Sequence, residues 1–211
     1  DGQCAVVARG AEPLDEAVMA ERLRRITGEV IAANPTLRAA RLVHLQEWYA
    51  ILPEYARRFR LDYADGWRFE DGEVKVEGEI RYGAEGEERT IRIRGKYDRV
   101  DRRGDTRRVV DYKLQNPDRI RKRAGDIDQA AQLMLYSWLV QAGEAAYLAI
   151  DRKRTVFAAV TPAPAESLAG WREALAAYLA RLGAGESFQA LGSHCDRCRV
   201  RGICRQGHWI A

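Results

Sequence analysis

Two neighbouring segments decide the fold: Gly95-Lys96-Tyr97-Asp98-Arg99-Val100-Asp101 and Val109-Val110-Asp111-Tyr112-Lys113-Leu114. Both are strand-like, and the short polar connection 102–106 contains glycine, so the pattern predicts a β-hairpin. Asp111 and Lys113 lie two residues apart, and on a strand their side chains therefore project to the same face. Asp98 adds a second carboxylate from the partner strand. The hairpin is therefore a candidate site for a divalent cation and a phosphodiester.

The composition is that of a soluble globular protein. The 211 residues can bury one substantial core without disulfide bonds. Hydrophobic residues make up 46% and charged residues 31%, both ordinary values. No apolar run approaches the roughly 20 residues of a membrane-spanning helix, so we expect no membrane association. The sequence starts at Asp1 without a methionine or a secretory signal, and we expect it to be a fragment or processed domain of a longer protein.

Basic residues gather on and after the hairpin, although the net charge is only +4. For any single residue, a solvated and salt-bridged surface is the ordinary explanation. The whole cluster beside an acidic centre favours nucleic acid as the partner. The cluster comprises Arg89, Arg92, Arg94, Lys96, Arg99, Arg102, Arg103, Arg107 and Arg108, followed by Arg119, Arg121, Lys122 and Arg123.

The remaining segments alternate between helical and strand periodicity. Helices are expected from Pro13 to about residue 33, from about 36 to 61 with a kink at Pro53, over 126–142 and over 166–182. Strands are expected at 67–82 and 90–94, in the hairpin, and at 145–150 and 155–160. The strands from 67 through the hairpin should form an antiparallel meander with one face packed on helices.

The acidic centre has the donors that phosphodiester hydrolysis requires. Carboxylates such as Asp98 and Asp111 are hard oxygen ligands that suit Mg²⁺ or Mn²⁺. Lys113 is placed to polarise the scissile phosphate or to position the attacking water. Gln132 and Tyr136 lie four residues apart on one helix face, from which they can orient Lys113 or contact the DNA backbone. The ordinary alternative is a surface Asp–Lys pair on a half-buried strand.

Three of the four cysteines, Cys195, Cys198 and Cys204, lie close together near the end of the sequence. This spacing argues for metal or cluster ligation in a reducing compartment, and therefore for a cytoplasmic protein. Zinc would take the three thiolates with His194, His208 or Cys4 as the fourth ligand. An iron–sulfur cluster would need Cys4, which is the only other thiol.

Three motifs resemble those of a known nuclease family. The segments containing Asp98, Asp111-Tyr-Lys113 and Gln132-Leu-Met-Leu-Tyr136 are similar to motifs II, III and QxxxY of the PD-(D/E)XK nucleases, in the branch of RecB and AddB. The resemblance implies an α/β, restriction-endonuclease-like fold with a central mixed β-sheet flanked by helices. It also implies that Asp98 and Asp111 are metal ligands, that Lys113 is the catalytic lysine, and that Gln132 and Tyr136 are an accessory pair.

The cysteine tail resembles that of AddB-type nucleases and of the CRISPR adaptation exonuclease. The resemblance implies a 4Fe-4S cluster held by Cys195, Cys198, Cys204 and Cys4, with a structural role, and we favour it over zinc. Such a link between the ends of the chain would stabilise the fold by closing a long loop. We therefore expect a nuclease-like core over residues 1–185 and a cysteine-rich tail over 186–211 that packs back on it.

These observations predict a Mg²⁺- or Mn²⁺-dependent deoxyribonuclease that acts as an exonuclease on single-stranded or duplex DNA ends. The resemblance also implies a recombination and repair system with a helicase subunit or domain. No Walker motif is present in this sequence, so any ATP-driven translocation would belong to another domain or chain. The family usually has a histidine in a Gly-x-x-x-His context on an early helix, and His44 lacks that context. The motif therefore lies upstream of Asp1, or the domain is a degenerate DNA-binding or scaffolding fold. A third hypothesis is a zinc-bearing interaction module, but it leaves the acidic centre unexplained.

Overall fold

The computed structural model describes residues 15–34, 41–84, 86–151 and 154–186, with side chains from residue 45 onward in the second of these ranges. The chain divides into two compact units. One comprises Asp1–Gly78 and Arg92–Trp171, and the other comprises Glu79–Ile91 and Arg172–Ala211. In the second unit, the Arg89 guanidinium donates a hydrogen bond to the Gly183 carbonyl at 3.1 Å. The first unit contains all the predicted site residues that the structure describes.

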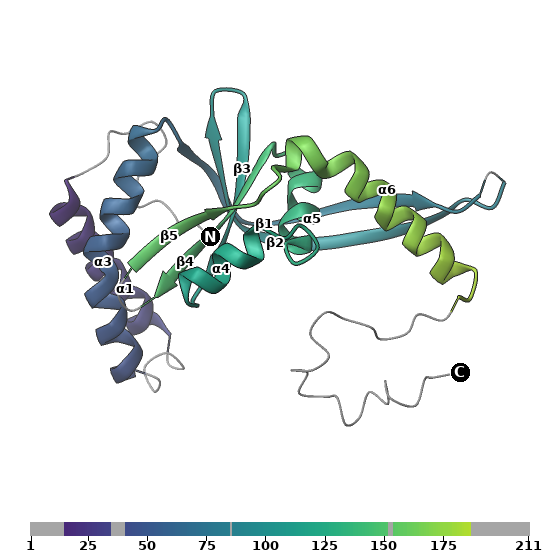
Figure 1. Ribbon diagram of the computed structural model, residues 1–211. Helices are drawn as coiled ribbons and strands as arrows, with labels where there is room; N and C mark the ends of the chain where they lie inside the picture. Colours follow the sequence, from purple (N-terminus) through teal and green to yellow (C-terminus); the bar gives the residue numbers. More distant parts are fainter. Residues whose placement is uncertain (1–14, 35–40, 85, 152–153, 187–211) are drawn as a thin grey trace. The chain divides into compact units, whose positions relative to one another are not determined.

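Five strands form one sheet in chain order (Figure 1). They are β1 (Arg68–Tyr82), β2 (Arg89–Arg103), β3 (Thr106–Lys113), β4 (Glu144–Asp151) and β5 (Arg154–Ala159). β2 and β3 pair antiparallel, β3 and β4 parallel, and β4 and β5 antiparallel. The expected α/β fold with a mixed sheet is therefore confirmed.

Within the described residues the helices are α1 (Glu16–Ala33), α3 (Arg41–Ala64), α4 (Pro117–Ala124), α5 (Ala131–Val140) and α6 (Pro164–Gly183). The parallel β3–β4 pair requires a crossover connection, and α4 and α5 supply it. None of the described helices is long and apolar enough to cross a membrane.

Strand β3 is buried on both faces. Val109 packs in a core cluster with residues of α4 and α5, among them Ile120 and Leu133. The next residue, Val110, packs in a different cluster with Ile51 of α3. Because consecutive strand residues point to opposite faces, α4 and α5 cover one face of the sheet and α3 covers the other. At β3 the helices therefore cover both faces and not one face of a meander, which agrees with the expected central sheet flanked by helices.

The hairpin turn is tighter than expected. β2 continues to Arg103 and β3 begins at Thr106, which leaves Gly104 and Asp105 as the turn. Gly104 has φ +57°, a left-handed conformation that glycine adopts without steric cost. The resulting register sets Asp101 opposite Arg108 and Arg99 opposite Val110.

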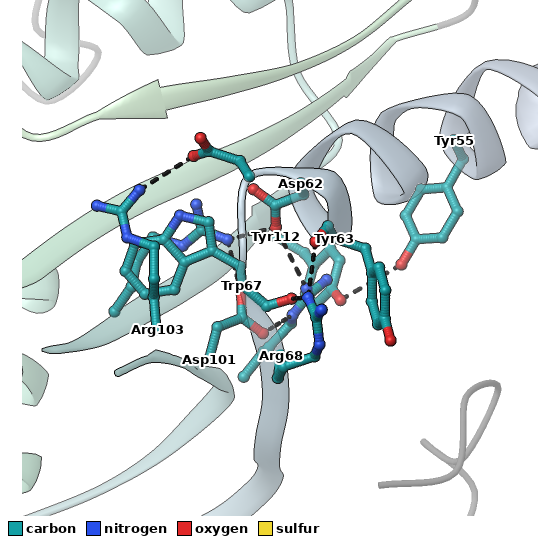
Figure 2. Close-up of polar contacts among 11 residues, drawn as sticks. Tyr55, Asp62, Tyr63, Trp67, Arg68, Asp101, Arg103 and Tyr112 are labelled. Atoms are coloured by element: carbon teal, nitrogen blue, oxygen red, sulfur yellow. Dashed lines mark hydrogen bonds and ion pairs between the residues drawn. The ribbon is translucent and has the colours of Figure 1, made fainter. Parts of the chain in front are cut away.

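A cluster of four buried charges joins α3 to this hairpin (Figure 2). The Arg99 Nε donates to Asp101 at 2.6 Å, and the Arg108 Nη2 donates to Asp101 at 2.8 Å. Arg108 also donates to Asp62 of α3. The Arg108 guanidinium lies 4.1 Å from the Trp67 ring centroid. With two carboxylates facing two guanidinium groups, the charge is balanced inside the protein.

This cluster corrects the interpretation of the basic residues of the hairpin. Arg99 and Arg108 are only 4% and 7% exposed, so they cannot form part of a nucleic-acid-binding surface. Arg103 forms ion pairs with Asp65 and Glu144 at 3.1 and 3.0 Å. The ordinary explanation of a salt-bridged surface residue fits Arg103, whereas the internal salt bridges of Arg99 and Arg108 match neither expectation.

The element boundaries also differ from the expected ones. Helix α4 was not expected, although Asn116 caps it by accepting a hydrogen bond from the Asp118 amide at 2.9 Å. The helix expected from 126 begins only at Ala131, because residues 126–130 form hydrogen-bonded turns.

The buried cluster predicts a large loss of stability when one carboxylate is removed. Asp101→Asn leaves two guanidinium groups facing a single carboxylate at a site with no exposure, and breaking a buried ion pair costs about 3 kcal/mol or more. Urea unfolding followed by circular dichroism measures the free energy of unfolding. The matched control is Asp105→Asn in the exposed hairpin turn, for which we expect no measurable change. Equal stability of the two variants would contradict the structural role of the cluster.

Candidate functional site

Asp98 and Asp111 lie close together where the β2–β3 pairing ends. The antiparallel register ends at Arg99 opposite Val110, and the two aspartates are the next residues on the two strands. The charge of Asp98 acts on Asp111. The Asp98 Oδ2 accepts a hydrogen bond from the Tyr112 amide at 2.9 Å, which fixes the orientation of that carboxylate. Asp111 is 3% exposed and lies on the face covered by α4 and α5. The end of the strand pair therefore brings the two carboxylates together.

Lys113 lies beside Asp111 on the same face. Its Nζ is 2.5 Å from the Asp111 Oδ2, and its side chain is 20% exposed. Burial nevertheless raises the pKa of Asp111; Lys113 opposes this rise, and the charge of Asp98 adds to it. The lysine therefore does not offset the cost of burying the Asp111 carboxylate next to a second acid.

The geometry fits a divalent cation. The Asp111 Oδ2 is fully buried, and its partner among the described residues is the Lys113 ammonium. Burial nevertheless keeps the pKa of Asp111 raised, so the lysine alone does not compensate this carboxylate. Two neighbouring carboxylates are hard ligands of the kind that Mg²⁺ and Mn²⁺ prefer. In the described ranges no group of three His, Cys, Asp or Glu side chains converges. Asp98 and Asp111 would thus hold the ion with water and substrate oxygens, as is common for Mg²⁺.

Two further residues adjoin the site that the sequence analysis did not single out, Tyr147 of β4 and Arg123 of α4. Tyr147 is the pairing partner of Asp111 in the parallel β3–β4 ladder, and its side chain is completely buried. The Tyr147 ring centroid lies 5.7 Å from the Lys113 Nζ and 5.3 Å from the Arg123 Cζ. Burial raises the pKa of the Tyr147 hydroxyl, which keeps it neutral at physiological pH.

Gln132 and Tyr136 form a pair on α5. The Gln132 Nε2 lies 3.5 Å from the Tyr136 Oη, at the outer limit of a hydrogen bond. Tyr136 packs directly on β2, where a Cβ added to Gly95 would lie 2.5 Å from the Tyr136 Cε1. Because Gly95 has no side chain, the Tyr136 ring can pack against β2 at this position, which is three residues before Asp98. Tyr136 and Tyr147 belong to the same core cluster, so Gln132 and Tyr136 lie on the face of the sheet that carries the candidate site.

The remaining candidate ligands fall outside the described residues. These are Cys4 in the first segment of the chain and Cys195, Cys198 and Cys204 in the last one, together with His194 and His208. His44 lies in the first turn of α3, where side chains are outside the described part. The proposed ligation of a cluster or of zinc therefore stays a prediction.

The raised pKa of Asp111 predicts that the site lowers the stability of the metal-free fold. An acid whose pKa is higher in the folded state destabilises that state above this pKa, and the cost disappears as the pH falls towards the unfolded value. We expect metal-free Asp111→Asn to be more stable than the unsubstituted protein at about pH 7, with the gain shrinking towards about pH 4. Urea unfolding in the presence of a chelator measures the free energy of unfolding of both proteins. When Mn²⁺ replaces the chelator, it should stabilise only the unsubstituted protein.

Asp118 provides a control of opposite sign. Its hydrogen bond with Arg154 lowers its pKa, so Asp118→Asn should lose a little stability at neutral pH, and the loss should disappear as the pH falls. A metal-free Asp111→Asn protein that is less stable than the unsubstituted one at neutral pH would contradict the assignment of a destabilising site.

Comparison with known proteins identifies the family. The model of the PD-(D/E)XK nuclease superfamily matches residues 5–205, nearly the whole chain. No curated protein matches. One solved structure that matches, titled "Crystal structure of SSO0001", has 17% sequence identity, a TM-score of 0.38 and coverage of 77% of each chain. Nucleases of this superfamily generally require divalent metals. The match of the family model and the mixed sheet agree with the resemblance of the motifs. The chain belongs to the PD-(D/E)XK nuclease superfamily.

Proposed function

We propose that this chain is a Mg²⁺- or Mn²⁺-dependent deoxyribonuclease whose site consists of Asp98, Asp111 and Lys113. The observation that carries the proposal is the buried Asp111 carboxylate. Its pKa is raised by burial although Lys113 on the same face pairs with it, and the charge of Asp98, a second carboxylate close by, adds to the rise. A protein retains such a destabilising arrangement where function requires it.

The roles of the residues follow from their positions. Asp98 and Asp111 would hold the divalent cation, which when bound would lower the pKa of a water and offer positive charge to the phosphate. Asp98 is held through its Oδ2 by the Tyr112 amide, which leaves its other oxygen for the cation. Lys113 sits at the edge of the site with part of its side chain exposed, so its ammonium can reach a phosphate oxygen or orient the attacking water. Gln132 and Tyr136 are proposed as the accessory pair that contacts the DNA strand.

The finer parts of the proposal rest on the resemblance to RecB and AddB. We propose that the protein acts as an exonuclease on single-stranded or duplex DNA ends. We also propose that it works in recombination or repair with a helicase subunit or domain as its partner. Division into a core over 1–185 and a tail over 186–211 is proposed on the same basis.

A second candidate function is DNA binding or scaffolding without catalysis. The observation that favours it is the small ligand set, since only two carboxylates meet in the described part of the chain and no early-helix histidine has the expected context. Both candidates place DNA on the same face, and cleavage separates them.

Cleavage of DNA by the purified chain tests the proposal. We expect the unsubstituted protein to degrade labelled single-stranded or duplex DNA with Mn²⁺ or Mg²⁺ and to lose activity in a chelator. Lys113→Ala should lower the rate by about 10² to 10⁴, as expected for a residue that assists proton transfer or phosphate polarisation. Asp111→Ala should abolish it. The matched control, Asp105→Ala, lies in the exposed turn of the same hairpin. No cleavage by the unsubstituted protein, or cleavage that survives both substitutions, would contradict the proposal.

The cysteine tail has its own test. We propose that Cys4, Cys195, Cys198 and Cys204 hold a 4Fe-4S cluster, with zinc as the alternative. Protein purified without oxygen should be brown, contain iron and sulfide, and absorb broadly in the visible range. Replacing Cys198 by Ser should remove the colour and lower the thermal stability. Colourless protein that contains stoichiometric zinc would exclude the cluster and favour the zinc site.

A further inference from the structure

Helix α4 follows β3 after three residues and carries four of the basic residues near the site. Arg121 is engaged locally, since its guanidinium donates to Asp118 at 2.8 Å. Arg119, Lys122 and Arg123 are spaced i, i+3 and i+4 and therefore share one face of the helix. Arg119 and Lys122 are exposed, whereas Arg123 is half-buried and lies towards the acidic centre.

Arg123 is held in place from two sides. Its Nε donates to the Gln129 carbonyl at 2.9 Å, in the turn that leads into α5. Its guanidinium lies against the ring of Tyr147, with 5.3 Å between the Cζ and the ring centroid. Because Tyr147 is buried and paired with Asp111, this ring is a rigid platform beside the candidate metal site.

The Tyr147 platform carries two cations. Lys113 approaches the same ring at 5.7 Å, so Lys113 and Arg123 flank Tyr147 next to the two aspartates. Within the described residues no carboxylate lies within ion-pair distance of the Arg123 guanidinium, unlike Arg121. Arg123 also acts on the buried Tyr147 hydroxyl, where its charge and a side-chain hydrogen bond oppose the rise in pKa that burial causes. A fixed cation and a buried hydroxyl thus meet at one point of the site.

We propose that Arg123 binds a phosphate of the DNA strand next to the phosphate at Asp111 and Lys113, and that Tyr147 positions it. The inference rests on the proposed function. A guanidinium held through its Nε presents its two remaining nitrogens as a fork, which matches two oxygens of one phosphate. Arg119 and Lys122 continue the same face outward, so the strand would leave the metal site along α4.

The test measures DNA binding and cleavage separately. Binding of a fluorescent single-stranded oligonucleotide is followed by anisotropy over a range of salt concentrations, with Ca²⁺ in place of Mg²⁺ so that binding is observed without turnover. Cleavage is measured with Mn²⁺. The variants are Arg123→Gln, Arg123→Lys, Tyr147→Phe, and Arg121→Gln as the matched control on the same helix.

Each lost phosphate contact lowers the slope of log K against log salt by about 0.7 for a single strand. We expect this decrease for Arg123→Gln, with a loss of about tenfold or more in kcat/KM, because a charge-assisted hydrogen bond to the substrate is removed. Arg123→Lys should keep the slope and lose part of kcat/KM, since it keeps the charge without the fork. Tyr147→Phe should keep the slope, and Arg121→Gln should match the unsubstituted protein in both measurements.

The outcomes separate this inference from the proposed function. If the unsubstituted protein cleaves DNA and Arg123→Gln keeps both its salt slope and its kcat/KM, the inference is wrong and the proposed function stands. A fall in thermal stability with an unchanged slope also overturns it, because Arg123 would then only join α4 to the turn before α5. If the protein binds DNA without cleaving it and the slope falls only in Arg123→Gln, the proposed function fails and the phosphate contact stands. No binding of DNA overturns both.

Discussion

The two-residue alternation of β3 is the constraint on which the rest of this structure depends. β3 is buried on both faces, so each of its side chains is committed to one of two interiors. Val109, Asp111 and Lys113 face α4 and α5. Arg108 and Val110 face α3. A shift of the register by one residue would exchange the two sets and bury unpaired charges on both faces.

The alternation produces two charged sites of opposite character. On the α3 face, Arg99 and Arg108 meet Asp62 and Asp101, and each charge has an opposite partner at short range. Such a closed cluster has strict geometric requirements and fixes α3 on the hairpin. On the other face the acids outnumber the one lysine in direct contact, and the pKa of Asp111 is raised. The charged cluster on the α3 face stabilises the fold. At the site of Asp98 and Asp111, the negative charge is not fully compensated by the protein.

The sequence predicted the acidic centre because the relevant information is local. Asp98, Asp111 and Lys113 follow from a hairpin and a period of two. The same period could have corrected the basic patch, since Arg99 directly follows Asp98 and must point to the other face. Tyr147 could not be found in this way, because its position beside Asp111 depends on a parallel pairing between strands that lie 30 residues apart in sequence. That register is set by packing across the crossover, which leaves no short-range signal.

Helix α4 was missed for a different reason. It has eight residues, and only Pro117, Ile120 and Ala124 are buried, so its apolar periodicity is too short to recognise. The Asn116-Pro117 start was a readable signal, since asparagine caps helices and proline suits their first turn. An eight-residue helix rises only about 12 Å, and α4 starts four residues after Lys113. Lys113 at the end of β3 and Arg123 near the end of α4 can therefore approach one buried ring from two rigid elements. Positions set by a strand and a capped helix are more precise than those set by loops, and the proposed contacts to two successive phosphates would need that precision.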